Sequence, residues 1–243
     1  MEPRLLREDM VDSLEHEAKA VVRSDRVGLA MREVPRQEFV PEDRSAYADT
    51  AHSHLGTRVL APSTAARLLE TADLRPDHDV LIVGVGVGYT AAVAAEIAGG
   101  RRVHAIDITR SLVYEARENL AGAGYDEVLV DCRDGARGLP EYAPFDRIVL
   151  EAAAVSPPPA LLEQLAPDGR LTMPLGTGVQ TLSVVDPDGE RTEHGTVAFE
   201  PLLVDGEQAG AIERNRTARE DAEFARRHER RRAGWERDWI DWD

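Results

Sequence analysis

The sequence has little lysine, few aromatic residues and a single cysteine. Lys19 is the only lysine and Cys132 the only cysteine among 243 residues. One cysteine cannot form an internal disulfide, and no Cys/His spacing indicates structural zinc; His52 and His54 fit a solvated loop better than a metal site. No apolar run approaches the roughly 20 residues that a membrane span needs, and the start of the chain lacks a signal peptide's apolar core. We expect a cytoplasmic protein without metal or membrane contact.

Basic residues are also under-represented. Asp and Glu number 45 against 29 Lys and Arg, which gives a formal net charge of −16. Such a surface repels phosphates, so we expect no nucleic-acid partner. The acids are spread along the chain instead of forming one tail. Distributed acid, with arginine kept and lysine almost absent, resembles the proteins of salt-loving archaea, in which salt screens self-repulsion. We therefore predict a halophilic protein.

The stretch around which the chain is organised runs from Val80 to Tyr89. It opens with four apolar residues ending at Val83, three of them β-branched, which predicts a buried parallel strand. A helix is predicted over 90–98. Between strand and helix, glycines stand at alternate positions: Gly84, Gly86 and Gly88. A strand, a glycine turn and a helix N-terminus form a cradle, because backbone without side chains lets a ligand approach closely.

The glycine spacing narrows the choice of cofactor. Dinucleotide-binding folds use G-x-G-x-x-G, in which the last glycine packs the helix on the strand. Here Tyr89 stands in that last position. The pattern favours S-adenosylmethionine over a nicotinamide or flavin cofactor, and a tight turn in some other α/β fold is the alternative.

Strands and helices alternate on both sides of this stretch. Further strands are predicted over 103–107, 127–131, 145–150 and 170–174, and an antiparallel pair over 180–185 and 195–199. This order predicts an α/β protein with a doubly wound, mostly parallel sheet of the Rossmann-like methyltransferase type and antiparallel edge strands. Helical periodicity covers residues 3–33, and an irregular segment runs to about Pro62. Ser63 is the predicted N-cap of the next helix.

We divide the chain into three parts: an N-terminal helical and substrate-loop extension (1–72), a cofactor-binding domain (73–206) and a charged helical tail (207–243). Trp235, Trp239 and Trp242 fall on one helical face of the tail. One hypothesis is that these tryptophans dock on their own domain. The other is a homodimer through the tail.

Two acidic residues complete the predicted cofactor site. Asp107 ends its strand 19 positions after Gly88, where a carboxylate can accept hydrogen bonds from both ribose hydroxyls of an adenosine. Asp134 follows the next strand and reaches the same carboxyl edge of the sheet. It can accept a hydrogen bond from the adenine amino group, while Gly135 leaves room for the ring.

These motifs together resemble the protein-L-isoaspartate O-methyltransferase family. The likeness covers about residues 10–205 in unbroken order and includes the segments 34–42, 46–49, 114–120, 124–128, 144–149 and 161–171. The resemblance implies methyl transfer from S-adenosylmethionine to the α-carboxylate of isoaspartyl residues in damaged proteins or peptides. The ester then collapses to a succinimide, which reopens partly to normal aspartate. A carboxylate is already ionised at pH 7, so this reaction needs no general base.

The sequence departs from the family pattern near the site of methyl transfer. Leu60 stands at the position of the family's active-site serine, Ile82 at that of a glutamate and Glu151 at that of a threonine. Val85 and Val87 replace hydroxyl residues between the glycines. Two hypotheses follow. In one the enzyme works, with Arg58 as a carboxylate clamp. In the other the chain is a catalytically inactive member that binds cofactor or peptide.

Overall fold

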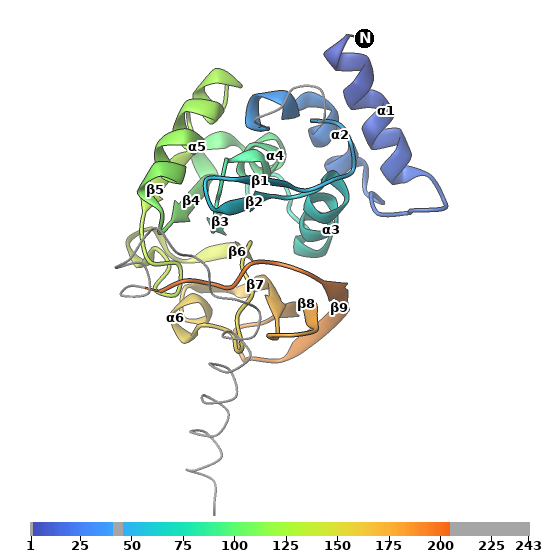
Figure 1. Ribbon diagram of the computed structural model, residues 1–243. Helices are drawn as coiled ribbons and strands as arrows, with labels where there is room; N and C mark the ends of the chain where they lie inside the picture. Colours follow the sequence, from blue (N-terminus) through green and yellow to red (C-terminus); the bar gives the residue numbers. More distant parts are fainter. Residues whose placement is uncertain (1, 41–45, 205–243) are drawn as a thin grey trace, which may run out of the picture.

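The computed structural model describes residues 2–40 and 46–204, and its centre is a seven-stranded sheet (Figure 1). The strand order is β5-β4-β3-β6-β7-β8-β9. The first four of these strands and β7 run parallel, whereas β8 and β9 are antiparallel additions at one edge. The fold class predicted from the sequence is confirmed. The strands are β3 (Val80–Val83), β4 (Val103–Asp107), β5 (Leu129–Cys132), β6 (Phe145–Leu150), β7 (Leu165–Leu175), β8 (Gln180–Val185) and β9 (Arg191–Val197).

Helices cover the sheet, and short elements connect them. The α-helices are α1 (Pro3–Glu15), α2 (Asp25–Glu33), α3 (Pro62–Ala72), α4 (Tyr89–Ala98), α5 (Arg110–Gly122) and α6 (Pro159–Leu162). The 3₁₀ turns are η1 (Arg36–Phe39), η3 (Gly100–Arg102) and η4 (Pro140–Tyr142). A two-stranded hairpin, β1 (His52–His54) with β2 (Thr57–Val59), lies apart from the main sheet. No helix within residues 2–40 and 46–204 is long and apolar enough to cross a bilayer.

Strand β3 lies inside the sheet and all four of its residues are buried. Val80 is paired with Val103 of β4 on one side and with Arg147 of β6 on the other. Side chains alternate between the faces, so Ile82 packs into the core under α3 and α4, while Leu81 packs into the core on the α6 side. A strand buried on both faces has the continuous apolar sequence that parallel sheets require.

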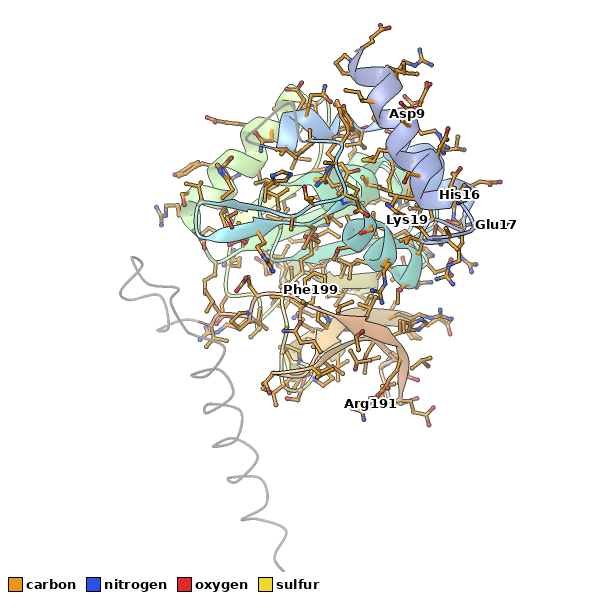
Figure 2. The ribbon with its side chains drawn as sticks, turned by 45° about the vertical axis from the view of Figure 1, so that its right-hand side comes forward. Asp9, His16, Glu17, Lys19, Arg191 and Phe199 are labelled. Carbon is orange, nitrogen blue, oxygen red and sulfur yellow. The ribbon has the colours of Figure 1, made fainter. Side chains whose placement is uncertain are left out.

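The N-terminal elements lie across the molecule from the β8–β9 edge. Figure 2 shows Lys19, just after α1, far from Arg191 at the start of β9. Helix α2 begins at an N-cap serine, Ser24, whose hydroxyl accepts a hydrogen bond from the Val27 amide. Met31 of this helix is fully buried in the core that α3 and α4 share. The N-terminal segment therefore packs directly on the sheet's helical layer.

Several boundaries differ from the sequence prediction. Ser63 is not the N-cap of α3: Ala61 holds that place, and Pro62 takes the first helical position, where its missing N–H costs nothing. The hairpin β1–β2 lies in the segment expected to be irregular. Strand β7 begins five residues before the predicted start at Arg170, and β9 lies at 191–197 instead of 195–199. The tail and its three tryptophans lie outside the described residues.

Candidate functional site

The glycine turn after β3 adopts a conformation that requires glycine. Gly84, Gly86 and Gly88 have φ angles of +82°, +54° and +98°, a region that L side chains rarely adopt. The amides of Gly84 and Val85 both donate hydrogen bonds to the Ile106 carbonyl, at 2.8 and 3.1 Å. The turn is therefore tied to the end of β4. Backbone without side chains lies at the carboxyl edge of the sheet at these three glycines, where the sequence predicts the cofactor cradle.

Asp107 stands at the end of β4 and is 7% exposed. Its Oδ2 accepts a hydrogen bond from the Gly86 amide at 3.2 Å, and its Oδ1 accepts one from the Thr109 amide at 2.8 Å. Both bonds fix the orientation of the carboxylate beside the glycine turn. A carboxylate has about four acceptor sites, so these two bonds are compatible with accepting hydroxyl groups of a ligand.

Asp134 and Gly135 follow β5 beside a cavity of about 390 Å³. The Asp134 side chain is 6% exposed, and its Oδ1 accepts a hydrogen bond from the Ala136 amide at 2.9 Å. A Cβ added to Gly135 would lie 2.6 Å from Val83 Cγ1, so only glycine fits there. The cavity has the size usual for a ligand site. Its walls come from the ends of β4 and β5 and the segment after them: Ile108, Cys132, Arg133, Asp134, Arg137, Gly138, Pro140 and Glu141.

A second, smaller cavity lies on the other side of the glycine turn. It brings together two parts of the chain that the sequence separates widely: the β2 segment, with Arg58 and Leu60, and the end of β6, with Glu151. Arg58 is half exposed, and its Nε lies 4.0 Å from Glu200 Oε1. The full lining is Thr57, Arg58, Val59, Leu60, Gly84, Val85, Gly86, Val87, Tyr89, Thr90 and Glu151. Arg58 and Leu60 thus lie next to the cradle, whereas Ile82 is buried in the core beneath it.

Glu151 is the unusual group of this second cavity. Part of the residue is accessible, but its Oε1 atom is buried and has no hydrogen-bond partner among the described residues. Burial raises the pKa of the Glu151 carboxyl to about 8; the nearby Asp107 charge adds to the increase, and a hydrogen bond with Thr90 opposes it. This carboxyl is therefore largely protonated at neutral pH.

Arg36 contacts two residues of the cavity lining, Leu60 and Tyr89. The sequence analysis does not predict a role for it. It is fully buried, and its Nε and Nη2 donate hydrogen bonds to the carbonyls of Ala46 at 2.8 Å and Leu60 at 2.6 Å. Its guanidinium lies 4.4 Å from the centre of the Tyr89 ring. Arg36 thereby ties the Leu60 backbone to the first residue of α4. Its place directly after Pro35, as the first residue of the 3₁₀ turn η1, gives no sequence signal for burial.

The strand order β5-β4-β3-β6 places Asp134, Asp107, the glycine turn and Glu151 in one row along the carboxyl edge of the sheet. The first three of these have the groups that the sequence predicts for an adenosine site: carboxylate acceptors at Asp134 and Asp107, and bare backbone at the turn. Gly135 instead makes room for the side chains of Val83 and Leu202. The fold and this site define the class of S-adenosylmethionine-dependent methyltransferases.

The family follows from similarity to known proteins. Residues 6–207 match the sequence model of the family described as Protein-L-isoaspartate(D-aspartate) O-methyltransferase (PCMT), and the chain belongs to this family. It is similar to Protein-L-isoaspartate O-methyltransferase of Methanopyrus kandleri, with 43% identity over 210 residues, 82% of this chain and 92% of that protein. The protein of the same name from Aeropyrum pernix is 42% identical over 205 residues, 80% of this chain and 78% of its own length.

Solved structures agree with this fold. A structure described as a protein-L-isoaspartate O-methyltransferase has a TM-score of 0.72 and 26% identity, over 86% of this chain and 69% of that one. A Plasmodium falciparum structure described as a methyltransferase of the same kind, in complex with S-adenosyl-L-homocysteine, also has a TM-score of 0.72. It is 22% identical and covers 81% of this chain and 98% of that one. At that identity the likeness supports the fold alone.

Proposed function

We propose that this protein transfers the methyl group of S-adenosylmethionine to the carboxylate of L-isoaspartyl residues in damaged proteins. The observation that carries this proposal is membership of the isoaspartate methyltransferase family across residues 6–207, a span that includes the glycine cradle and both acidic strand ends. The relatives that bear this activity in their names are aligned over about four fifths of the chain.

The residues have separate tasks in this proposal. Val83, Gly84, Gly86 and Gly88 form the cradle, Asp107 accepts the ribose hydroxyls, and Asp134 with Gly135 receives the adenine. Bound S-adenosylmethionine supplies an electrophilic methyl group on a sulfonium. The acceptor carboxylate is ionised at pH 7, so the protein has to place it in line with that methyl and need not remove a proton.

Arg58 is our candidate for holding the acceptor carboxylate. It lines the same cavity as Leu60, which stands where the family has its serine. A guanidinium can bind a carboxylate through two parallel N–H groups, which a leucine side chain cannot do. We expect Arg58→Ala to raise the KM for an isoaspartyl peptide while S-adenosylmethionine still binds. The exposed Arg110 provides a matched control as Arg110→Ala. An unchanged KM in Arg58→Ala would contradict the clamp.

The second candidate function is that of an inactive family member, and Leu60 motivates it because the serine hydroxyl is lost. Calorimetric titration of S-adenosylmethionine in concentrated KCl comes first, followed by release of S-adenosylhomocysteine in the presence of an isoaspartyl peptide. Binding with turnover supports the enzyme. Binding without turnover, or a folded protein that does not bind, supports the inactive member.

We further propose that this enzyme acts in the cytoplasm of a halophile, and that its architecture follows the division 1–72, 73–206 and 207–243. The acidic composition supports the halophilic assignment. A homodimer through Trp235, Trp239 and Trp242 is proposed from their spacing in the sequence. Sedimentation of the full chain tests it: the triple alanine variant should be a monomer where the parent chain is a dimer.

A further inference from the structure

We infer that Glu151 binds the acceptor carboxylate as a neutral acid, donating a hydrogen bond from its own carboxyl group in the cavity that it shares with Arg58. This inference rests on the proposed function, because it concerns the same acceptor. It assigns to Glu151 the part of a specificity-determining hydrogen-bond donor at the place where the family has a threonine hydroxyl.

The position of Glu151 in the row of site residues supports this role. Asp134 and Asp107 lie on the β5 and β4 side of the glycine turn, and Glu151 lies on the β6 side. A ligand whose adenosine occupies the first side extends its remaining end across the turn towards Glu151. The Glu151 backbone amide donates to the Val83 carbonyl at 2.8 Å, which fixes the residue beside the cradle. A Cβ placed on Gly84 would lie 3.8 Å from Glu151 Cβ, so the backbone and Cβ of Glu151 adjoin the turn directly.

The chemistry of the cavity selects the protonated form. The Oε1 atom is buried without a partner, and a buried polar atom in that state is costly unless a ligand supplies the missing hydrogen bond. The groups that act on the Glu151 carboxyl are the Thr90 hydroxyl and the Asp107 carboxylate, and Arg58 and Tyr89 line the same cavity. Burial also raises the pKa of Tyr89, so that its ring carries no charge at neutral pH. Arg58 is half exposed and lies near Glu200, and the buried guanidinium of Arg36 lies against the Tyr89 ring. Among residues 2–40 and 46–204, no buried cation is therefore paired with Glu151 to keep it ionised.

A neutral acid and an arginine form a suitable pair for one carboxylate. A protonated carboxyl has one O–H donor, and Arg58, which lines the same cavity, adds N–H donors. An ionised Glu151 would instead place a second negative charge beside the acceptor, as happens when two carboxylates share a site. The acceptor oxygen that receives the methyl forms the new C–O bond while the C–S bond of the donor breaks, and the Glu151 proton stays on Glu151 throughout.

The test is the pH profile of kcat/KM for an isoaspartyl peptide between pH 6 and 9.5, followed by S-adenosylhomocysteine release because the ester product is base-labile. For the parent enzyme we expect a decrease above pH 8 that approaches tenfold per unit, and this decrease should lie in KM. Glu151→Gln keeps an N–H donor and cannot ionise, so it should stay within about threefold at pH 7 and lose the alkaline decrease. Glu118→Gln, at an exposed position on α5, is the matched control and should follow the parent profile.

Three outcomes would overturn the inference. The first is a Glu151→Gln profile identical to that of the parent. The second is loss of turnover in Glu151→Gln at every pH while the variant remains folded. The third is weaker binding of S-adenosylmethionine, but not of S-adenosylhomocysteine, to Glu151→Gln, which would make Glu151 a counter-ion of the sulfonium. A parent protein that binds S-adenosylmethionine yet never methylates the peptide would instead refute the proposed function.

Discussion

Arg36 has no accessible surface, yet it carries a charge, and among residues 2–40 and 46–204 no carboxylate is hydrogen-bonded to it. Two backbone carbonyls and an aromatic ring solvate the guanidinium in place of water. Burial lowers the pKa of Arg36, but an arginine keeps its proton at any physiological pH. The planar fork is what lets one side chain reach the Ala46 and Leu60 carbonyls together.

We expect Arg36→Met to lower the free energy of unfolding by roughly 2 kcal/mol or more, because two buried carbonyls lose their donors. Chemical denaturation measures this loss. Arg110→Met, at an exposed position, should change stability by less than about 0.5 kcal/mol. Equal effects in the two variants would contradict the role given to Arg36.

Glu151 predicts a pH dependence of stability. Its pKa is about 8 in the folded protein and near 4.5 in the unfolded chain, so between these values the unfolded chain binds fewer protons. Stability contributed by the neutral carboxyl is therefore complete below pH 4.5 and is lost as pH rises towards 8. Glu151→Gln lacks this dependence. The free energy of unfolding of Glu151→Gln should exceed that of the parent only slightly at pH 5 and by a few kcal/mol at pH 8. Melting temperatures of both proteins across this pH range measure the difference. A constant difference would contradict the assignment.

The elements explain why some of the fold was predictable and some was not. Strands β4, β6 and β8 have the predicted bounds because apolar, β-branched runs mark them. Strand β9 is exposed along nearly its whole length, so its sequence has no apolar alternation. The strand predicted from the sequence therefore starts at residue 195, four residues after the observed start at Arg191. The strands of the hairpin β1–β2 have three residues each and are partly exposed, so they also have no apolar pattern that would predict them.

Some parts of the candidate site are likewise predictable from local sequence patterns, and others are not. The glycine cradle and the two acidic strand ends could be predicted, because each belongs to a local pattern of strand followed by turn. No local pattern predicts the second cavity, because Arg58 and Glu151 are 93 positions apart in the sequence and line one cavity only through long-range packing. Only the resemblance to the family places Arg58, Leu60 and Glu151 near the site of methyl transfer. The burial of Arg36 depends on contacts of the same long-range kind.

Gly135 shows how closely β3 and the segment after β5 approach. We expect Gly135→Ala to lower the free energy of unfolding by about 1–3 kcal/mol, because its Cβ would lie 2.6 Å from Val83 Cγ1 and 3.1 Å from Leu202 Cδ1. Gly122→Ala is the control: no atom of the described part of the chain lies within 4 Å of the added Cβ, and Gly122 is the last residue of α5. That variant should be neutral or slightly stabilised. The denaturant midpoints of the two variants measure these changes, and equal midpoints would contradict the close packing at Gly135.

For the whole molecule, the net charge of −16 sets the response to salt. Salt weakens surface ion pairs as well as repulsion, but the excess of acid makes repulsion the larger effect. We expect the melting temperature to rise as KCl increases from 0.1 to 1 M, where the Debye length falls from about 10 to about 3 Å. Choline chloride at equal ionic strength should act similarly, since screening depends on ionic strength. A melting temperature that falls over this range would contradict dominance of repulsion.

The sole cysteine stands in the wall of the larger cavity, next to Asp134. Its position makes Cys132 a natural chemical reporter, because any thiol reagent that labels this chain must label it there. S-adenosylhomocysteine should slow the reaction of Cys132 with a chromogenic disulfide by tenfold or more, whereas adenine-free homocysteine thioethers should not. Unaltered labelling under saturating S-adenosylhomocysteine would place the nucleoside elsewhere. Occupancy of the nucleoside site can thus be followed in the unmodified protein, without an engineered probe and independently of turnover.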